Sequence, residues 1–293
     1  MIRAAIAIGS NSTRMLTAEI AGGGMRPILR GREETRLFLG LDSQGNIAPD
    51  KLEATAQAVA RLADQARQAG AESISLLATS ASRDAKNSEA FARRILEVSG
   101  LRLTIISGEE EARLAFKAVS EGKRRLVMDI GGGSTEWTLG EGGQVEWAVS
   151  MQIGASRLLK AQPIASPQDA QRALAQTRSI MAPFADRLSA LPPAPALIGL
   201  GGSCTTAAAM LMGREAHNEA VEGQTVTLAQ AMGQLDALSA MTLEERMQVP
   251  GLPPTRAAHI CHGLCILITA LELTGFDRLT VSGKTNLDGY LQP

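Results

Sequence analysis

Two carboxylates flank three glycines and a serine in the segment 129–136, whose sequence is Asp-Ile-Gly-Gly-Gly-Ser-Thr-Glu. Glycine tolerates positive φ and lets a ligand approach the backbone, and successive N–H groups in such a turn form a concave anion site. A carboxylate beside bound phosphate normally holds a divalent cation or orients a water, because alone it would repel the phosphate. A tight hairpin turn also favours Gly and Asp, but it needs neither three glycines nor two acids. The segment therefore predicts a phosphate-binding loop with Asp129 and Glu136 beside it.

The same order of strand, glycine turn and strand opens the chain, where a Gly-Ser-Asn-Ser turn follows the apolar run 5–8. A third turn, Gly-Gly-Ser, follows the apolar run 196–200. Two similar loops suggest an internal duplication, with each loop in the first hairpin of its own half. Loops that faced each other would hold a phosphate chain from both sides. The candidate phosphate-binding residues are Gly9, Ser10, Asn11, Ser12, Gly131, Gly132, Gly133, Ser134, Gly201, Gly202 and Ser203.

Composition sets the size and class of the protein. The chain has 293 residues, enough for two domains of roughly 150 residues each. Hydrophobic residues make up 45% and aromatic residues 3%, so aliphatic side chains and Met must fill the core. The scarcity of aromatics, with 29 Lys and Arg against 30 Asp and Glu, argues against a nucleic-acid surface, which needs stacking platforms and basic excess. A phosphate ligand would have to be bound by local arginines and backbone N–H groups.

The cysteines and the N-terminus indicate the compartment. Three widely spaced cysteines give no disulfide framework. The chain leads directly into its first predicted strand without a signal peptide, and no apolar run reaches the roughly 18 residues of a membrane span. We therefore expect a cytoplasmic protein without a membrane partner. Cys261 and Cys265 lie one helical turn apart beside His262, which permits a metal site, although buried thiols in an apolar helix are the simpler interpretation.

Periodicity and turn signals predict the same order of elements in both halves. The first half is predicted as strands 2–8, 13–20 and 26–32, helix 49–69, strand 73–78, helix 84–98, strand 103–106 and a helix capped by Ser107. The second half is predicted as strands 124–129, 134–140 and 145–150, a helix from 166 toward 191 broken near Pro183, a stiff connector at 192–195, strand 196–200, helices 203–212, 228–240, 243–248 and 255–274, strand 279–281 and a terminal helix. This order is typical of an α/β ribonuclease-H-like domain, a mixed sheet of five strands flanked by helices. We place the domains at 1–121 and 122–293.

Several segments in order carry a family resemblance. They are Gly9-Ser-Asn-Ser12, Ala78-Thr-Ser-Ala-Ser-Arg83, Ile106-Ser-Gly-Glu-Glu-Glu-Ala112, Asp129-Ile-Gly-Gly-Gly-Ser-Thr-Glu136, Gly199-Leu-Gly-Gly-Ser203 and Leu252-Pro-Pro-Thr-Arg256. Together they resemble the exopolyphosphatase and guanosine-pentaphosphate phosphohydrolase family, over nearly the whole chain. The resemblance implies the actin-like ATPase fold in its short form, with a cleft between two ribonuclease-H-like domains.

The resemblance also implies an activity, which is Mg²⁺-dependent hydrolysis of the terminal phosphoanhydride in inorganic polyphosphate or guanosine pentaphosphate. By position, Glu111 is the implied general base, Asp129 holds metal or orients the water, and Arg83 neutralises phosphate oxygens. Glu136 is the implied second metal ligand, and two-domain members with an apolar C-terminal helix often form homodimers. Without the resemblance, Glu111 could equally be a solvated acid of the first helical turn, and Arg14 could reach a phosphate or face solvent.

Three positions depart from the family pattern. Ala7 and Ala258 stand where acids are usual, and Leu287 stands where an arginine is usual. If the acid replaced by Ala7 helps to hold Mg²⁺, metal affinity or turnover falls. Two alternatives to a working hydrolase therefore stay open: a weakly active or inactive relative that binds the same ligands as a regulatory protein, and an ATP-dependent kinase or actin-like ATPase.

Overall fold

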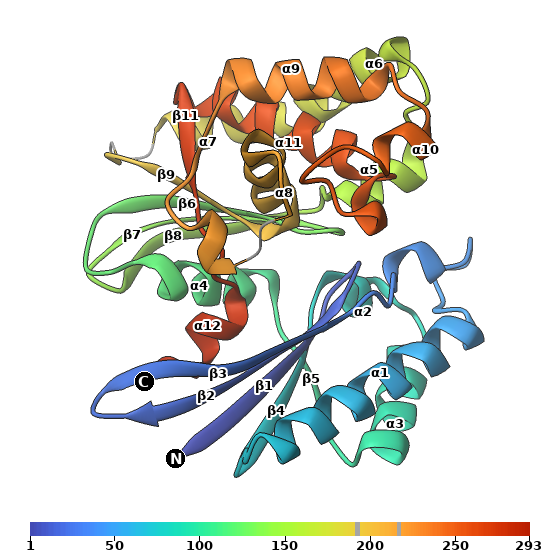
Figure 1. Ribbon diagram of the computed structural model, residues 1–293, viewed down its shortest axis with the longest axis vertical. Coiled ribbons are helices and arrows are strands. Elements are labelled where there is room, and N and C mark those ends of the chain that lie inside the picture. Colours follow the sequence, from blue (N-terminus) through green and yellow to red (C-terminus); the bar gives the residue numbers. More distant parts are fainter. Residues whose placement is uncertain (191–193, 216–217) are drawn as a thin grey trace. The chain divides into compact units, whose positions relative to one another are not determined.

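The computed structural model describes residues 1–190, 194–215 and 218–293. Residues 192 and 193 of the expected proline connector, and His217, lie outside these residues. The described chain divides into two compact units, residues 1–118 with 286–293 and residues 119–285. Figure 1 shows that each unit contains a sheet with helices packed on it.

The first unit has the predicted ribonuclease-H-like topology. Its elements are β1 (Ile2–Ile8), β2 (Thr13–Ala21), β3 (Gly24–Glu33), η1 (Phe38–Gly40), α1 (Pro49–Gln68), β4 (Ser73–Ala78), α2 (Ser80–Asp84), α3 (Ser88–Ser99), β5 (Leu103–Ile105), α4 (Gly108–Val119) and α12 (Asn286–Leu291). The strand order is β3-β2-β1-β4-β5. The first three strands pair antiparallel, and β4 and β5 add in parallel. The helix expected at 84–98 is α3, which begins at Ser88, because Ala85 leaves the helical conformation with ψ 124°. The short helix α2 occupies the segment before it, where a turn was expected.

Side chains along β1 point alternately to the two faces of the sheet, and this explains why the C-terminal helix belongs to this unit. Ile6 and Ile8 point into the core formed with α1 and α3, whereas Ala5 and Ala7 contact α12 on the other face. Small alanines leave room for Leu287 of α12, which is 1% exposed. Residues 286–293, which the sequence assigned to the second domain, are therefore part of the first unit.

The second unit repeats this topology with one strand more than expected. Its elements are β6 (Arg125–Ile130), β7 (Thr135–Glu141), β8 (Gln144–Met151), α5 (Ala155–Ala161), α6 (Pro167–Met181), η2 (Ala182–Phe184), α7 (Ala185–Ser189), β9 (Leu197–Leu200), α8 (Gly201–Met212), η3 (Asn218–Val221), β10 (Thr225–Thr227), α9 (Leu228–Ser239), α10 (Leu243–Arg246), η4 (Pro254–Arg256), α11 (Ile260–Thr274) and β11 (Arg278–Val281). The order is β10-β11-β9-β6-β7-β8. The sheet has six strands because β10, only three residues long, pairs antiparallel with β11. Such a short strand leaves no periodic signal.

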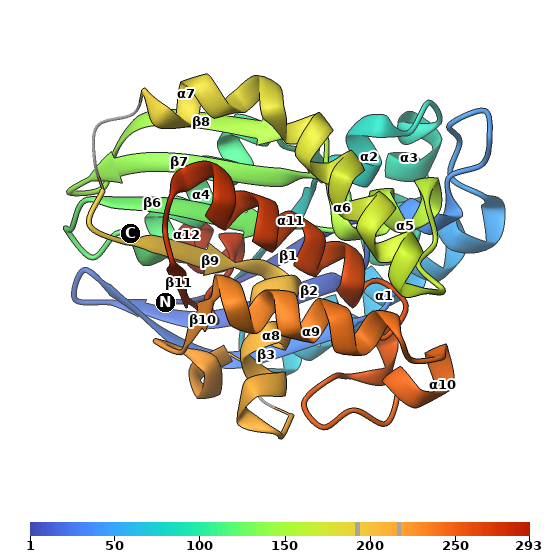
Figure 2. The same ribbon diagram turned by 90° about the horizontal axis from the view of Figure 1, so that it is seen from above.

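Helices cover one face of this sheet, and α11 lies alongside α6 and α9 (Figure 2). Residues 260–271 of α11 are all buried, which agrees with the apolar helix predicted there. The helix begins at Ile260 rather than at 255, because η4 precedes it. The predicted break near Pro183 is confirmed by the 3₁₀ turn between α6 and α7.

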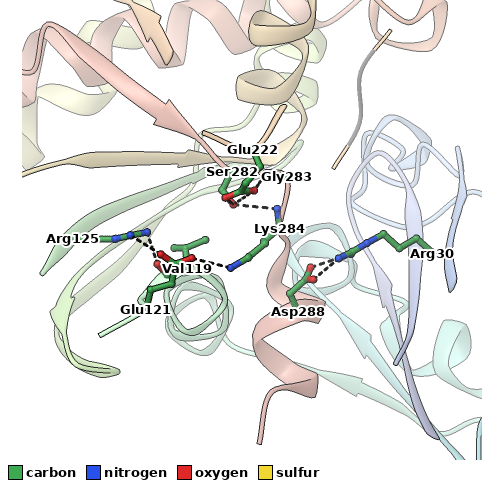
Figure 3. Close-up of polar contacts among 9 residues, drawn as sticks. All are labelled: Arg30, Val119, Glu121, Arg125, Glu222, Ser282, Gly283, Lys284 and Asp288. Atoms are coloured by element: carbon green, nitrogen blue, oxygen red, sulfur yellow. Dashed lines mark hydrogen bonds and ion pairs between the residues drawn. The ribbon is translucent and has the colours of Figure 1, made fainter. Parts of the chain in front are cut away.

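Polar contacts hold the two segments where the chain passes between the units (Figure 3). Within the second unit, Glu121 accepts hydrogen bonds from Arg125 at 2.9 Å and from Lys284 at 3.4 Å. Within the first unit, Arg30 donates to Asp288 at 2.6 Å and so holds α12 on the sheet.

None of the helices in the described ranges is both long enough and apolar enough to cross a lipid bilayer.

Candidate phosphate-binding and catalytic residues

The glycine loop after β6 is held from behind by the start of α5. A hydrogen bond from Gly131 N to Ser134 O, 3.0 Å, closes the turn. The Gly131 carbonyl accepts from Ala155 N at 3.1 Å, and the Gly132 carbonyl accepts from two amides of the same helix start at 2.8 and 2.9 Å. The Gly133 carbonyl accepts from Arg157 Nε at 2.6 Å. Three successive carbonyls of the loop are therefore bonded on one side.

The opposite side of the same peptides is what a phosphate would meet. In a trans peptide the N–H points away from the C=O, so the N–H groups of Gly132, Gly133 and Ser134 are directed away from α5. Such convergent N–H groups form an anion site. The close packing depends on Gly154, where an added Cβ would lie 2.5 Å from the backbone of Gly132.

Asp129 and Glu136 stand directly opposite each other on β6 and β7. Opposite residues of antiparallel strands project to the same face, so the two carboxylates lie side by side. Glu136 is 2% exposed, and its Oε1 accepts from Ser150 Oγ at 2.7 Å. No group of three or more His, Cys, Asp or Glu side chains that could hold a metal occurs in residues 1–190, 194–215 and 218–293. Two carboxylates nevertheless fit Mg²⁺, which often takes one or two and fills its remaining positions with water and phosphate oxygens.

The third glycine turn lies at the start of α8 and packs against the end of β6, next to the loop 131–134. Gly201 has φ +85°, and an added Cβ would lie 2.6 Å from Asp129 Oδ1. An added Cβ on Gly202 would collide with the guanidinium of Arg256, which is 7% exposed. The guanidinium of Arg256 therefore lies beside the first turn of α8, at the positive end of that helix. Ser203 packs against Gly263 of α11, which leaves only its N–H for a ligand.

The loop of the first unit is built in the same way. A hydrogen bond from Gly9 N to Ser12 O, 3.0 Å, closes the turn, and the carbonyls of Ser10 and Asn11 accept from Phe38 N and Arg36 N. The side chain of Asn11 donates to Glu34 at 2.9 Å and so is used within the protein. A phosphate bound in this loop would therefore be held by backbone N–H groups and not by the Asn11 side chain.

The two residues predicted for catalysis in the first unit form an ion pair. Ser107 caps α4, as predicted, by accepting from Glu110 N at 3.1 Å, and this places Glu111 in the first turn. Arg83 Nη1 donates to Glu111 Oε2 at 3.0 Å and to Ile106 O at 2.9 Å. Glu111 is 8% exposed, unlike the exposed acids before it. Arg83 therefore orients Glu111, and its buried Nη2 finds no acceptor in the described parts of the chain.

The Cys-His cluster of α11 is part of the core. Burial raises the pKa of the Cys261 thiol to about 11 and that of Cys265 to about 12, so neither readily becomes a thiolate ligand. Burial lowers the pKa of His262 to about 4. The ring Nε2 of His262 lies 2.8 Å from the Gln162 carbonyl at the end of α5. The simpler interpretation, buried thiols, is favoured.

Three residues that support the second loop were not singled out from sequence. They are Gly154, Arg157 and Arg256, the last of which the sequence offered only as part of a family segment and not as a neighbour of Gly202. Gly154 and Arg157 lie 21 and 24 residues beyond Gly133, and no local pattern links them to it. Within the second unit, the structure brings together the loop, Asp129, Glu136 and the start of α8.

Two mixed sheets with ribonuclease-H topology, each carrying a glycine loop after its first strand, define an α/β protein of the class predicted from the sequence. A family model described as the Ppx/GppA phosphatase family matches residues 16–291. The chain belongs to this family.

Individual relatives agree with that assignment. Exopolyphosphatase 2 of Mycobacterium tuberculosis is 32% identical over 308 residues, covering 98% of this chain and 96% of that protein. Guanosine-5'-triphosphate,3'-diphosphate pyrophosphatase of Aliivibrio fischeri is 26% identical and covers 98% of this chain, which spans 58% of that longer protein. The crystal structure of the Aquifex aeolicus family member superimposes with a TM-score of 0.81 at 29% identity, covering 99% of this chain and 96% of that one.

Proposed function

We propose that this protein hydrolyses the terminal phosphoanhydride bond of inorganic polyphosphate or guanosine pentaphosphate. The observation that carries the proposal is the loop 131–134, whose three carbonyls are bonded from behind so that its N–H groups form an anion site. The names of two relatives, one an exopolyphosphatase and one a guanosine pyrophosphatase, support the substrate class.

The chemical step needs an anion site and a general base. The N–H groups of the second unit's loop, with Arg256, bind phosphoryl oxygens and neutralise the charge that develops on them. Glu111 of the first unit takes a proton from the attacking water. The water oxygen bonds to the terminal phosphorus while the bridging P–O bond breaks, and the electron pair leaves on the shortened chain. Arg83 orients the Glu111 carboxylate through the hydrogen bond from its Nη1.

A divalent cation is proposed as the cofactor, with Asp129 and Glu136 as its protein ligands. When bound, Mg²⁺ would supply neutralising charge for phosphate oxygens. Ser150 holds Glu136 in position through the hydrogen bond to Oε1.

A regulatory binding protein is the second candidate, favoured by one observation. Opposite Ala7 stands Arg14, whereas the corresponding pair in the second unit consists of two acids. The first unit therefore lacks the acid pair that could hold a cation, and ligand could bind without turnover.

One assay separates the two candidates. Purified protein is incubated with polyphosphate, guanosine pentaphosphate or ATP, with Mg²⁺ or with EDTA, and free phosphate is measured. We expect Mg²⁺-dependent release from one of the first two substrates. Binding without release would favour the regulatory protein, and phosphoryl transfer from ATP to a second substrate would favour a kinase.

The role of Glu111 is tested by Glu111→Gln, with Glu110→Gln as the matched control on the exposed side of the same helical turn. Loss of a general base is expected to lower phosphate release by about 10²–10⁴-fold with an unchanged circular dichroism spectrum, while the control keeps its activity. Equal activity in both variants would remove Glu111 from the proposed role.

A further inference from the structure

The loop 131–134 is held by backbone amides at two of its carbonyls and by a side chain at the third. Ala155, Ser156 and Arg157 supply the amides that bond Gly131 O and Gly132 O. The Gly133 carbonyl instead accepts from Arg157 Nε at 2.6 Å. The orientation of the peptide between Gly133 and Ser134 therefore depends on a side chain.

The geometry points to Arg157 as a positioning residue for phosphate binding. Because C=O and N–H are antiparallel in a trans peptide, holding the Gly133 oxygen directs the Ser134 N–H into the proposed anion site. Without this hydrogen bond the peptide can rotate, and glycine at 133 offers little resistance to rotation. Arg157 is itself held at its other end, where Nη2 donates to Gln152 Oε1 at 3.1 Å.

The charge of Arg157 strengthens the same effect. A guanidinium bonded to a carbonyl polarises the peptide and makes its N–H a better donor to an anion. The residue acts on the anion through the loop rather than by contact. This inference rests on the proposed function only in assuming that the ligand of the loop is a phosphate chain.

The test compares Arg157→Met, Arg157→Lys, Arg157→Ala and Arg172→Met. The last variant removes a solvent-exposed arginine of α6 in the same unit and serves as the control. Polyphosphate binding is measured in EDTA by calorimetry, and phosphate release with Mg²⁺ gives kcat and KM. Arg157→Met is expected to weaken binding and to raise KM by about tenfold, the scale of one hydrogen bond to a charged group, with a smaller change in kcat. Arg157→Lys restores part of the affinity, and millimolar guanidinium restores part of it to Arg157→Ala.

The outcomes separate this inference from the proposed function. Binding by Arg157→Met as tight as that of Arg172→Met would overturn the role of Arg157. So would equal loss in the Lys and Met variants together with an equal drop in melting temperature, because that pattern indicates a structural role only. If the natural protein binds polyphosphate but releases no phosphate, the proposed hydrolysis fails while the binding measurements still decide the role of Arg157.

Discussion

The glycine loops of the two units have the same turn but different neighbours. In both, the first glycine N–H bonds to the serine carbonyl three residues later at 3.0 Å. In both, carbonyls of the turn are bonded by amides from a segment that follows the third strand. The shared hydrogen bonds show that the shape of the glycine turn is a property of this hairpin in the fold.

The residues beside the two loops differ in charge, and the segments that hold the two loops differ in structure. The cross-strand pair beside the loop is Ala7 with Arg14 in the first unit and Asp129 with Glu136 in the second. The first pair contains the positively charged guanidinium of Arg14. The second contains two carboxylates that could bind a metal cation. Support in the first unit comes from an irregular segment in which Arg36 has φ 49°, while in the second it comes from the start of α5. We infer that duplication kept the turn and allowed the charge beside it to diverge.

The largest expected effect comes from breaking the support of the second loop. In Gly154→Ala the new Cβ would meet the Gly132 backbone at 2.5 Å, so the loop must shift. A displacement of this kind is expected to lower phosphate release by about 100-fold. Steady-state assays of this variant are compared with Gly233→Ala, whose added Cβ in α9 meets nothing within 4 Å. Full activity in Gly154→Ala would show that contact with α5 does not set the shape of the loop.

A second effect is a loss of stability at acid pH. We expect it only for α5, the helix that holds the glycine loop of the second unit. His262 holds the end of α5 and has a pKa of about 4 because it is buried. Between its ordinary pKa of 6.5 and about 4, the unfolded chain binds a proton that the folded chain does not, so stability falls as pH falls through this window. The loss is about 2 kcal/mol at pH 5.

Urea unfolding at pH 7 and pH 5 tests this prediction in the natural protein and in His262→Gln. The variant keeps a donor for Gln162 O but cannot titrate, so its stability should change less with pH. Protection factors from hydrogen exchange, which correct for the slower intrinsic exchange at pH 5, should fall at pH 5 for Ser156 and Arg157 but not for Arg36 and Phe38. A parallel decline in protein and variant would rule out His262 as the cause.

The smallest effect is expected from a substitution at Ala7, which stands where the family usually has an acid. From the sequence alone, Ala7→Asp would be expected to raise Mg²⁺-dependent activity. The structure places Arg14 directly opposite, so the new carboxylate pairs with a guanidinium, a contact worth about 0.2–1 kcal/mol. We therefore expect little change in the Mg²⁺ dependence of phosphate release. A clear rise in magnesium titrations would show that Arg14 does not neutralise residue 7.

Much of the fold was predictable because its signals are local. Strand alternation, the cap at Ser107 and the break near Pro183 each depend on neighbouring residues, and each was found. The extra strand β10 and the true position of α12 were missed, because a three-residue strand and a short terminal helix are defined by what they pack against. The helix expected at 84–98 was found, but it begins at Ser88, because Ala85 leaves the helical conformation without a glycine or proline to mark the break.

The amino-acid sequence by itself determined the glycine turns, the acids beside them and the family, because these depend on residue type and spacing along the chain. Only the tertiary structure decided how they are held: Arg83 beside Glu111, Arg256 against Gly202, and Arg157 on the Gly133 carbonyl. These partners lie 24 to 54 residues apart, and contacts over such separations depend on how strands and helices pack. The direction of a peptide N–H in a glycine loop, on which anion binding depends, is therefore set by distant residues.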